Sequence, residues 1–437
     1  MEIIPTKKSF KDYIYFWIGQ IFSLFGSQVA IFVLIWWLTV ETNNPIVLSF
    51  ASLSFILPFV LAAPIAGVFS DRLNRKKLIM TVDFLQALAT LVLIIFMTMG
   101  YKELWFIFTI MALRSVFQAF HQPTVNAIIP TMVPKEKLSR INGLGFLFSG
   151  FVQLAAPMFA ALLLVFLSVE QALWVDVITF VLAFIPLVFI SIPSIRVEKE
   201  NDEDLEKEAF TKELKDGFHT LTTTPGMIVL LILSMLGNFL IQPLNVLSSY
   251  YAHNIHSATV FEYALISAGI QGGIVVGAVI TSIKKHWNHK MDWFFGTVAI
   301  LMVGYGMLAF APYRFFGFIF SALFLIGIGL PIINTIYQTI LQTNIPHEKL
   351  GRVSSIDATF SMLISPIGSI IVGPLAVIFT INGLYLISAL LGVVLCVILY
   401  FFTGVRKVDF DKNLNLDISA PSLEKNIINK KSIINTN

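Results

Sequence analysis

Residues Gly67 to Lys77 have the sequence Gly-Val-Phe-Ser-Asp-Arg-Leu-Asn-Arg-Lys-Lys, a short charged segment between two apolar runs, 46–69 and 78–99. Each run is long enough to cross a bilayer as a helix, which takes ~20 mostly apolar residues. The segment therefore reverses the chain at a membrane surface. Its four cations indicate the cytoplasmic surface, because loops on that side carry the excess of Lys and Arg.

The composition of the whole chain also indicates a membrane protein. Of its 437 residues, 57% are hydrophobic and only 13% are charged, whereas soluble chains are about 45–50% apolar and about 25% charged. The single cysteine, Cys396, excludes an intrachain disulfide and a cysteine-based metal site. We expect no metal and no cofactor. The first apolar run is too long for a cleaved signal peptide and is expected to stay as a span.

Counting apolar runs of spanning length predicts an all-α integral membrane protein with twelve transmembrane helices. The predicted spans are 13–40, 46–69, 78–99, 104–129, 141–167, 171–193, 226–250, 259–283, 291–311, 314–339, 352–378 and 383–403. With twelve spans, both termini and every second loop share one side. That side holds 26 of the 29 Lys and Arg residues, the other side holds Lys102 and Arg314, and Arg114 lies within a span. This asymmetry places both termini in the cytoplasm.

The chain also contains an internal repeat. The octet Pro134-Lys-Glu-Lys-Leu-Ser-Arg-Ile141 recurs 212 residues later as Pro346-His-Glu-Lys-Leu-Gly-Arg-Val353, each time after an even-numbered span. Chance recurrence is the alternative, but the matched topological position favours duplication. We therefore predict two pseudo-symmetric six-helix halves, an architecture of secondary transporters. The predicted divisions are an N-terminal half (1–193), a cytoplasmic linker (194–225), a C-terminal half (226–403) and a cytoplasmic tail (404–437).

The linker and the tail are the two long polar segments. Within the linker, Leu205, Phe210, Leu214 and Leu221 fall near one helical face, which predicts an amphipathic helix on the cytoplasmic surface. A flexible tether that never docks is the alternative. The tail is rich in Asn and Lys, and we expect it to be disordered.

The charged segment Gly67–Lys77 also carries a motif. Its pattern Gly67-x-x-x-Asp71-Arg72-x-x-Arg75-Lys76 resembles the loop 2–3 signature of the major facilitator superfamily at every specified position. The resemblance covers essentially the whole chain, because that family also has twelve spans, two halves and a central insert. It implies that this loop is a cytoplasmic latch that engages the other half.

Physical reasoning gives the latch a partner. Asp71 is an anion suited to the N-terminus of span eleven, where the helix dipole favours negative charge. Asp357, just inside that span, is a candidate partner of Arg72 or Arg75. A purely topological role explains the cations but leaves the glycine and the aspartate unexplained.

Two further stretches indicate a subgroup within this family. The chain is similar there to bacterial drug exporters of the macrolide-efflux type. The stretches are residues 114–130, Arg-Ser-Val-Phe-Gln-Ala-Phe-His-Gln-Pro-Thr-Val-Asn-Ala-Ile-Ile-Pro, and the triplet Gly351-Arg-Val353. Siderophore and lysophospholipid exporters share parts of this pattern. The resemblance implies proton-driven efflux of a bulky amphipathic compound. The sequence departs from drug antiporters in span five, where small residues replace the glycines of the Gly-Pro-rich motif that is often found in that class.

Ionisable residues inside spans are the best pointers to function, because a charge near the bilayer centre costs several kcal/mol. Arg114 lies ~15 Å into span four, so it faces either a cavity or a permanent ion-pair partner. Asp83 is expected nearer the cytoplasm and Asp176 at a depth closer to Arg114. We predict a role in proton coupling or transport for these three residues.

The resemblance implies which spans line the transport path, and amide side chains on those spans form a candidate substrate cavity. They are Gln20, Gln28, Asn126, Gln153, Asn238, Gln242, Asn245, Asn334 and Gln338. Helix packing is the alternative role for each of them. His121, beside Pro123, is expected at a structural position in a kinked helix. The glycine-rich stretches at Gly269 and Gly327 are expected to be close helix contacts rather than nucleotide loops.

The sequence excludes several classes of protein. It has no phosphate-binding Gly-x-x-x-x-Gly-Lys-Ser/Thr loop and no His-Glu-x-x-His or Gly-x-Ser-x-Gly motif, so we predict neither ATP-driven transport nor an enzyme. The prediction is a multi-pass secondary transporter of a bacterial cell membrane that exports an amphipathic drug in exchange for protons, as a monomer and without nucleic acid. Export of an endogenous siderophore or lysophospholipid is the alternative, and a non-transporting receptor is the third hypothesis.

Overall fold

The computed structural model describes residues 6–193, 216–284, 287–403 and the single residues 405, 408 and 410, without the side chains of residues 7, 68, 71, 72 and 347. The first six helices are α1 (Lys7–Thr42), α2 (Pro45–Arg72), α3 (Arg75–Thr98), α4 (Leu104–Met132), α5 (Lys135–Phe166) and α6 (Val169–Phe189). The remaining elements are α8 (Met227–Leu240), α9 (Gln242–Tyr250), η1 (Tyr251–Ile255), α10 (Val260–Ile283), α11 (Lys290–Ala309), α12 (Phe316–Asn344), α13 (His347–Phe379) and α14 (Ile381–Phe402).

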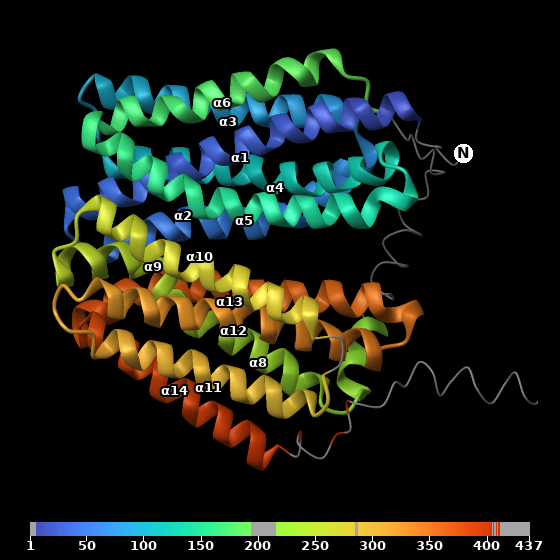
Figure 1. Cartoon of the computed structure of the whole chain (residues 1–437), viewed down its shortest axis with the longest axis vertical. Coiled ribbons are helices and arrows are strands. Elements are labelled where there is room, and N and C mark those ends of the chain that lie inside the picture. The colour runs from blue at the N-terminus through green and yellow to red at the C-terminus, as the bar shows by residue number, and fades with distance from the viewer. Residues whose placement is uncertain are drawn as a thin grey trace, which may run out of the picture.

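These elements confirm the predicted fold class. Twelve helices are long and apolar enough to cross a membrane, and one of these spans, Met227–Ile255, consists of α8, α9 and the π-helical turn η1. Figure 1 shows two bundles lying against each other, one formed by α1 to α6 and the other by α8 to α14. We call the side on which α1 begins the basic face and the other side the opposite face.

The repeated octet has a local explanation. Pro134 and Pro346 are the N-cap residues of α5 and α13, and Glu136 and Glu348 lie in the first turns. A proline ends the preceding helix because it lacks an N–H group, and an acidic residue in a first turn is favoured by the helix dipole. The octets therefore lie inside the next helices, which begin several residues earlier than the apolar runs indicated.

The described end of the linker is docked rather than free. Residues 216–223 are helical, and Asp216 accepts hydrogen bonds from Lys349 Nζ at 2.8 Å and from Arg352 Nη1 at 3.3 Å. The rest of the predicted linker helix and most of the tail lie outside the described residues.

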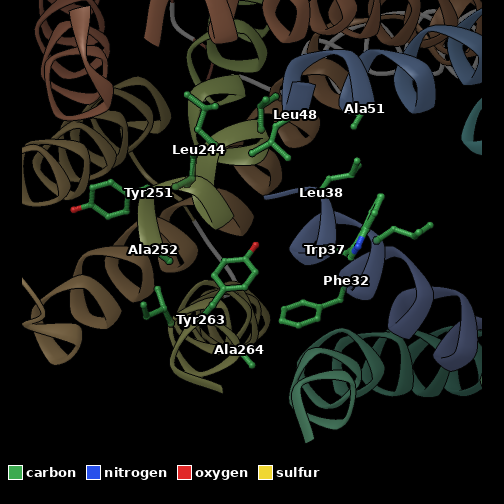
Figure 2. Packing of buried hydrophobic residues seen from close by; sticks show 14 of the residues in the cluster. Phe32, Trp37, Leu38, Leu48, Ala51, Leu244, Tyr251, Ala252, Tyr263 and Ala264 are labelled. Carbon is green, nitrogen blue, oxygen red and sulfur yellow. The ribbon is translucent and has the colours of Figure 1, made fainter. Parts of the chain in front are cut away.

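The hydrophobic core shows where the two halves meet. One large cluster joins both halves toward the opposite face, and Figure 2 shows Phe32 of α1 beside Tyr263 of the second half. Toward the basic face the buried residues divide into two separate clusters, one within each half. The halves are therefore packed together at the opposite face and apart at the basic face.

Specific contacts between the halves fall in the same region. The Thr39 hydroxyl of α1 donates to Ser249 Oγ of α9 at 2.7 Å. The ring of Tyr263 stacks on Phe32 and on Trp36, with centroid distances of 5.2 and 5.5 Å. All of these residues lie toward the opposite-face ends of their helices. These contacts close the seam between the halves on that side.

Within the second half, glycines set the closest helix contact. A Cβ atom built on Gly273 of α10 would lie 2.2 Å from the carbonyl oxygen of Phe324, and one on Gly327 of α12 would lie 2.2 Å from that of Ile270. Both distances are shorter than any real carbon–oxygen contact, so only glycine fits. The prediction that these glycine-rich stretches are helix contacts is confirmed.

Candidate functional site

A cavity of about 270 Å³ lies in the seam between the two halves, and we call it the seam cavity. The stacked rings of Phe32 and Tyr263 form part of its wall. Two predicted cavity residues, Gln28 and Gln153, line it from the first half. The Tyr385 hydroxyl is also in its wall, fully buried and with no hydrogen-bond partner in the described part of the chain.

The second half completes the wall of the seam cavity with Asn245, Ser248, Ser267 and Gln271. Its polar lining is therefore made of amides and hydroxyl groups. Such a wall suits hydrogen bonding to a neutral polar group, while the aromatic rings offer apolar surface.

A second cavity, of about 280 Å³, lies within the first half, and we call it the first-half cavity. It extends from Tyr13 and Asn142, near the basic-face ends of α1 and α5, to Asp176 of α6. The predicted cavity residues Gln20 and Asn126 line it.

The first-half cavity contains a cluster of Asp83, His121 and Gln20. Asp83 is 5% exposed and lies ~12 Å along α3 from its basic-face end. Its Oδ1 is 3.3 Å from His121 Nε2, and its Oδ2 accepts a long hydrogen bond of 3.5 Å from Gln20 Nε2. Within the described residues, His121 is the only basic side chain in ion-pair distance of Asp83. Asp83 thus has no permanent cation beside it.

The same network assigns the tautomer of His121. Its Nε2 faces two acceptors, Asp83 Oδ1 and, at 2.7 Å, Gln20 Oε1, so Nε2 carries the hydrogen. Its Nδ1 is buried and has no hydrogen-bond partner among the described atoms. The atom at which a neutral His121 would accept a proton is therefore Nδ1.

Arg114 and Asp176 form a different kind of arrangement. Arg114 Nη1 lies 2.8 Å from Asp176 Oδ2, and the two side chains are 9% and 7% exposed. Asp176 also accepts hydrogen bonds from Ser27 at 2.9 Å and from Thr90 at 2.6 Å. Arg114 is 2.5 Å from the Thr90 hydroxyl. Asp176 is thus paired with a cation and hydrogen-bonded, which ties α1, α3, α4 and α6 together.

A third and larger cavity, of about 1460 Å³, separates α2 from α13 toward the basic face. Val60 and Ile65 line it from α2, Phe360 and Met362 from α13, and Phe218 from the docked end of the linker. It lies on the same side as the separated core clusters. The halves therefore leave an apolar opening between α2 and α13.

The predicted latch is made of helix ends more than of a loop. Gly67 to residue 72 belong to α2, and Asn74 caps α3 by accepting a hydrogen bond from Lys77 N at 3.1 Å. Arg75 donates to the Ala127 carbonyl oxygen at 2.8 Å. A Cβ on Gly67 would meet no atom within 4 Å.

The other described latch residues also have partners in their own halves. Lys76 donates to the carbonyl oxygens of Val188 and Ile190 at 2.8 and 2.7 Å. Asp357 is buried and accepts a hydrogen bond from Tyr337 of its own half. The suggested pairing of Asp357 with Arg75 is therefore not formed in this arrangement. The side chains of Asp71 and Arg72 lie outside the described part of the chain.

The remaining predicted amides have other positions. Asn238 donates to the Ser234 carbonyl oxygen at 2.9 Å, and Gln242 donates to the Asn238 carbonyl oxygen at 3.1 Å, so both bond the backbone of their own span. Asn334 and Gln338 of α12 are exposed and line none of the three cavities above.

Sequence reasoning missed His121 and Thr90 as members of these clusters. A signal for His121 was present: Arg114 and His121 are seven residues apart on α4, as are Gln20 and Ser27 on α1. A spacing of seven repeats one helical face. One face of each helix thus carries polar side chains at two depths. Thr90 has no comparable signal, because threonines are common in spans.

Two helical halves around a central seam, with ionisable groups buried inside the spans, define a class of protein: membrane transporters built from paired bundles. The chain belongs to the Major Facilitator Superfamily, whose family model matches residues 16–369. The resemblance inferred from the loop motif is thereby confirmed.

Curated relatives are similar over most of their length. Macrolide efflux protein A of Streptococcus pyogenes is 26% identical over 395 residues, covering 90% of this chain and 96% of that protein. The Multidrug efflux pump Tap of Mycolicibacterium fortuitum is 22% identical over 392 residues, covering 88% and 94%. The family and these relatives are transport proteins.

Solved structures share the fold. A bacterial homologue of the iron transporter ferroportin, in an inward-facing state, has a TM-score of 0.67 at 18% identity, covering 90% of this chain and 99% of that one. A POT family transporter in complex with 5-aminolevulinic acid has a TM-score of 0.71 at 13% identity, covering 93% and 99%. At these identities the likeness concerns the fold alone.

Proposed function

We propose that this chain is a secondary active exporter that moves a small amphipathic compound, of the drug or macrolide kind, out of a bacterial cell in exchange for protons. The observation that carries the proposal is the pair of separate buried sites: a neutral polar cavity in the seam and an Asp83 without a permanent cation. The first suits a ligand, and the second suits a proton that comes and goes. The names of the efflux relatives support the direction and the kind of cargo.

The proposal includes an orientation. The Lys and Arg partition supports a cytoplasmic basic face and cytoplasmic termini. The contacts of Thr39, Trp36 and Tyr263 then close the outside, and the opening between α2 and α13 faces the cytoplasm. In this arrangement the transporter is ready to take up cargo from inside the cell or from the inner leaflet. Alternating access requires a second arrangement in which these contacts separate.

Among the three predicted coupling residues, the geometry favours Asp83 for the proposed coupling role. Arg114 and Asp176 neutralise each other, and Asp176 accepts two further hydrogen bonds, so a proton on Asp176 would break an ion pair. Asp83 would lose no permanent ion pair on protonation. We propose that Arg114 and Asp176 hold the first half together. The charged residues of the Gly67–Lys77 segment, with Asp357, would act when the basic face closes.

The test is an efflux assay in bacterial cells that lack their major drug pumps. Expression of this chain should raise the minimum inhibitory concentration of at least one amphipathic drug, and a dye of that class should accumulate less. Collapse of the proton gradient with an uncoupler should abolish the difference. The panel includes macrolides, a siderophore and a lysophospholipid, so that export of an endogenous compound is recognised as such. No change for any compound would contradict export, and a non-transporting receptor would give that result.

A further inference from the structure

Two loops of the second half contact each other at the opposite face, and we call this contact the loop clasp. One loop joins η1 to α10, and the other joins α11 to α12. The Arg314 N–H group donates a hydrogen bond to His256 Nδ1 at 3.3 Å. The Tyr313 hydroxyl donates to Ser257 Oγ at 2.9 Å. Arg314 Nη2 also lies 3.6 Å from Glu262 Oε1, so backbone, hydroxyl and charged groups all join the two loops.

His256 occupies the middle of the clasp and is 1% exposed. Its ring lies edge-on to Tyr251, with the centroids 4.6 Å apart, and is stacked on Tyr313 at 6.4 Å. Because a backbone N–H group donates to Nδ1, the hydrogen of the neutral ring is on Nε2. That atom is buried and has no hydrogen-bond partner in the described part of the chain. The clasp thus holds His256 as a neutral imidazole whose one acceptor nitrogen is already in use.

The described surroundings of His256 offer no free carboxylate to a protonated ring. The titratable and charged side chains around it are Tyr251 and His253 of η1, Glu262 of α10, Tyr313 and Arg314 of the α11–α12 loop, and Tyr385 of α14, which packs on Tyr251. Glu262 is the one carboxylate among them, and it already faces the Arg314 guanidinium and accepts from the Thr259 N–H group at 2.7 Å. Burial accordingly lowers the pKa of His256.

A second proton on His256 would therefore break the clasp. It could bind only to Nδ1, where it would replace the hydrogen bond from Arg314 by two N–H groups that face each other. The resulting cation would also be buried against Arg314, which is itself a cation, and burial of an unpaired charge is costly. In addition, Ser257 and Arg314 have positive φ angles of 49° and 58°, in the left-handed region that side chains disfavour. Release of the two loops would relieve this backbone conformation.

The clasp also fixes the segment of the second half that closes the seam. η1 follows directly on α9, whose Ser249 accepts the hydrogen bond from Thr39 of the first half. Within η1, His253 lies edge-on to Trp36 of α1, with the centroids 5.3 Å apart. Single π-helical turns of this kind are frequent at functional sites. η1 is thus held by the first half on one side and by the clasp, through the adjoining His256, on the other.

We propose that a proton taken up by His256 from the opposite face releases the loop clasp, so that η1 can move and the seam contacts of α9 and η1 can separate. His256 is in this mechanism a positioning residue, which acts on the seam through η1. The inference goes beyond the proposed export function and uses it only for the orientation. With the opposite face outside the cell, external acid favours the arrangement that is open to the outside.

The direction of the pH dependence follows from the two states of His256. In the open clasp the ring is hydrated and has the ordinary histidine pKa of about 6.5, whereas burial in the closed clasp lowers this pKa. The closed clasp therefore keeps its full stability at pH values above about 6.5. As the pH falls below this value, the ratio of open to closed clasp rises, by up to about tenfold per pH unit for one proton.

Hydrogen exchange of the purified full-length protein in lipid nanodiscs tests the clasp directly, because the Arg314 amide is one of its donors. The segment around Arg314 is followed from about pH 5.5 to 7.5, the range in which histidine titrates, with rates corrected for the intrinsic pH dependence of exchange. Its protection should fall by up to about tenfold per pH unit below about pH 6.5. Constant protection in the wild type would overturn the proposal.

Three variants identify the group that titrates. His256→Gln keeps a hydrogen-bond acceptor and His256→Phe keeps an aromatic ring between the tyrosines, and neither side chain titrates in this range. Both variants should remove the pH dependence of protection. His253→Gln removes the neighbouring histidine and should keep that dependence. An unchanged pH dependence in both His256 variants, or its loss in His253→Gln, would overturn the proposal.

A second measurement follows the seam itself. Spin labels are attached through Glu103→Cys at the beginning of α4 and Ile378→Cys near the end of α13, two exposed positions on different halves, in a Cys396→Ala background. Pulsed electron paramagnetic resonance should show a longer distance gaining population as the pH falls, and His256→Gln should weaken this response. A response of the same size in His256→Gln, or a clasp that opens without any change in the distance, would overturn control of the seam by His256.

The efflux assay keeps these failures distinct from failure of the export function. Cells that export a drug although the clasp does not respond to pH would retain the exporter and lose the role of His256.

Discussion

The ion pair of Arg114 and Asp176 gives the sharpest prediction about what holds the first half together. Its charged atoms are 2.8 Å apart, and both side chains are more than nine-tenths buried. Removing one partner leaves the other charge buried without compensation. We expect Arg114→Met and Asp176→Asn each to lower the free energy of unfolding by about 3–5 kcal/mol.

The double variant should lose less stability than the two single variants added together. With Arg114→Met and Asp176→Asn combined, no charge stays unpaired. The asparagine oxygen can still accept from Ser27, and its amide group can donate to the Thr90 hydroxyl oxygen, which no longer accepts from Arg114. Replacement of a buried ion pair by uncharged groups of similar volume is often close to neutral. We therefore expect the double variant to recover most of the loss, with a coupling energy of at least about 2 kcal/mol.

The measurement is unfolding of the purified protein by SDS titration in mixed micelles, followed by circular dichroism. Asp292→Asn removes a surface charge but keeps an oxygen that can accept the hydrogen bond from Tyr400. It is the control and should change the free energy by less than about 0.5 kcal/mol. Single variants as stable as this control would refute a stabilising role for the ion pair. So would a double variant whose loss of stability equals the sum of the two single losses. The double variant should also keep proton-driven uptake into inverted vesicles. A folded double variant without transport would instead place the pair in the coupling machinery.

Three further predictions concern other parts of the fold. Gly327→Ala should destabilise the protein, because its Cβ would lie 2.2 Å from a carbonyl oxygen of α10, whereas Gly272→Ala, with 3.7 Å to its nearest neighbour, should not; thermal unfolding compares the two. In a background without the native cysteine, Thr39→Cys combined with Ser249→Cys should form a disulfide on oxidation and stop transport until a reductant is added, because the disulfide locks the opposite face closed. The hydrogen bond from Lys349 of α13 lowers the pKa of Asp216. The docked linker end should therefore stay protected from hydrogen exchange at neutral pH and lose protection only as the pH falls below the ordinary aspartate value of about 3.9. Asp216→Asn should lose this protection already at neutral pH.

Much of the architecture was predictable because it depends on quantities that a sequence displays directly. Span number follows from the lengths of apolar runs, and the two halves follow from the repeated octet. Buried ionisable residues were found for the same reason: Arg114, Asp83 and Asp176 stand out against apolar neighbours. The residues that they contact were harder to predict, because these contacts depend on how each helix is rotated and tilted against the next.

The amides illustrate that limit. Gln28 and Asn238 both lie on predicted path helices, yet the first lines the seam cavity and the second bonds the backbone of its own span. Asp357 is a second example, because it was predicted to pair with Arg72 or Arg75, but its partner is Tyr337 of α12. Which side of a helix faces a cavity is set by its packing against several neighbouring helices at once. A single sequence does not contain that information.

The distribution of contacts between the halves explains how one chain can adopt two arrangements. The closed side is held by hydrogen bonds such as those from Thr39 to Ser249 and from Ser52 to Ser369, worth about 1 kcal/mol each, and by aromatic pairs worth about 0.5–1.5 kcal/mol each beyond their burial. The apolar cluster that joins the two halves adds to them. On the other side, α2 and α13 expose apolar residues such as Ile65, Phe360 and Met362 to the opening. Closing that opening would bury them and bring the Gly67–Lys77 segment toward α13. Closing one side while opening the other would thus exchange one set of apolar contacts and hydrogen bonds for another, and a ligand that binds one arrangement more tightly would shift the balance between them.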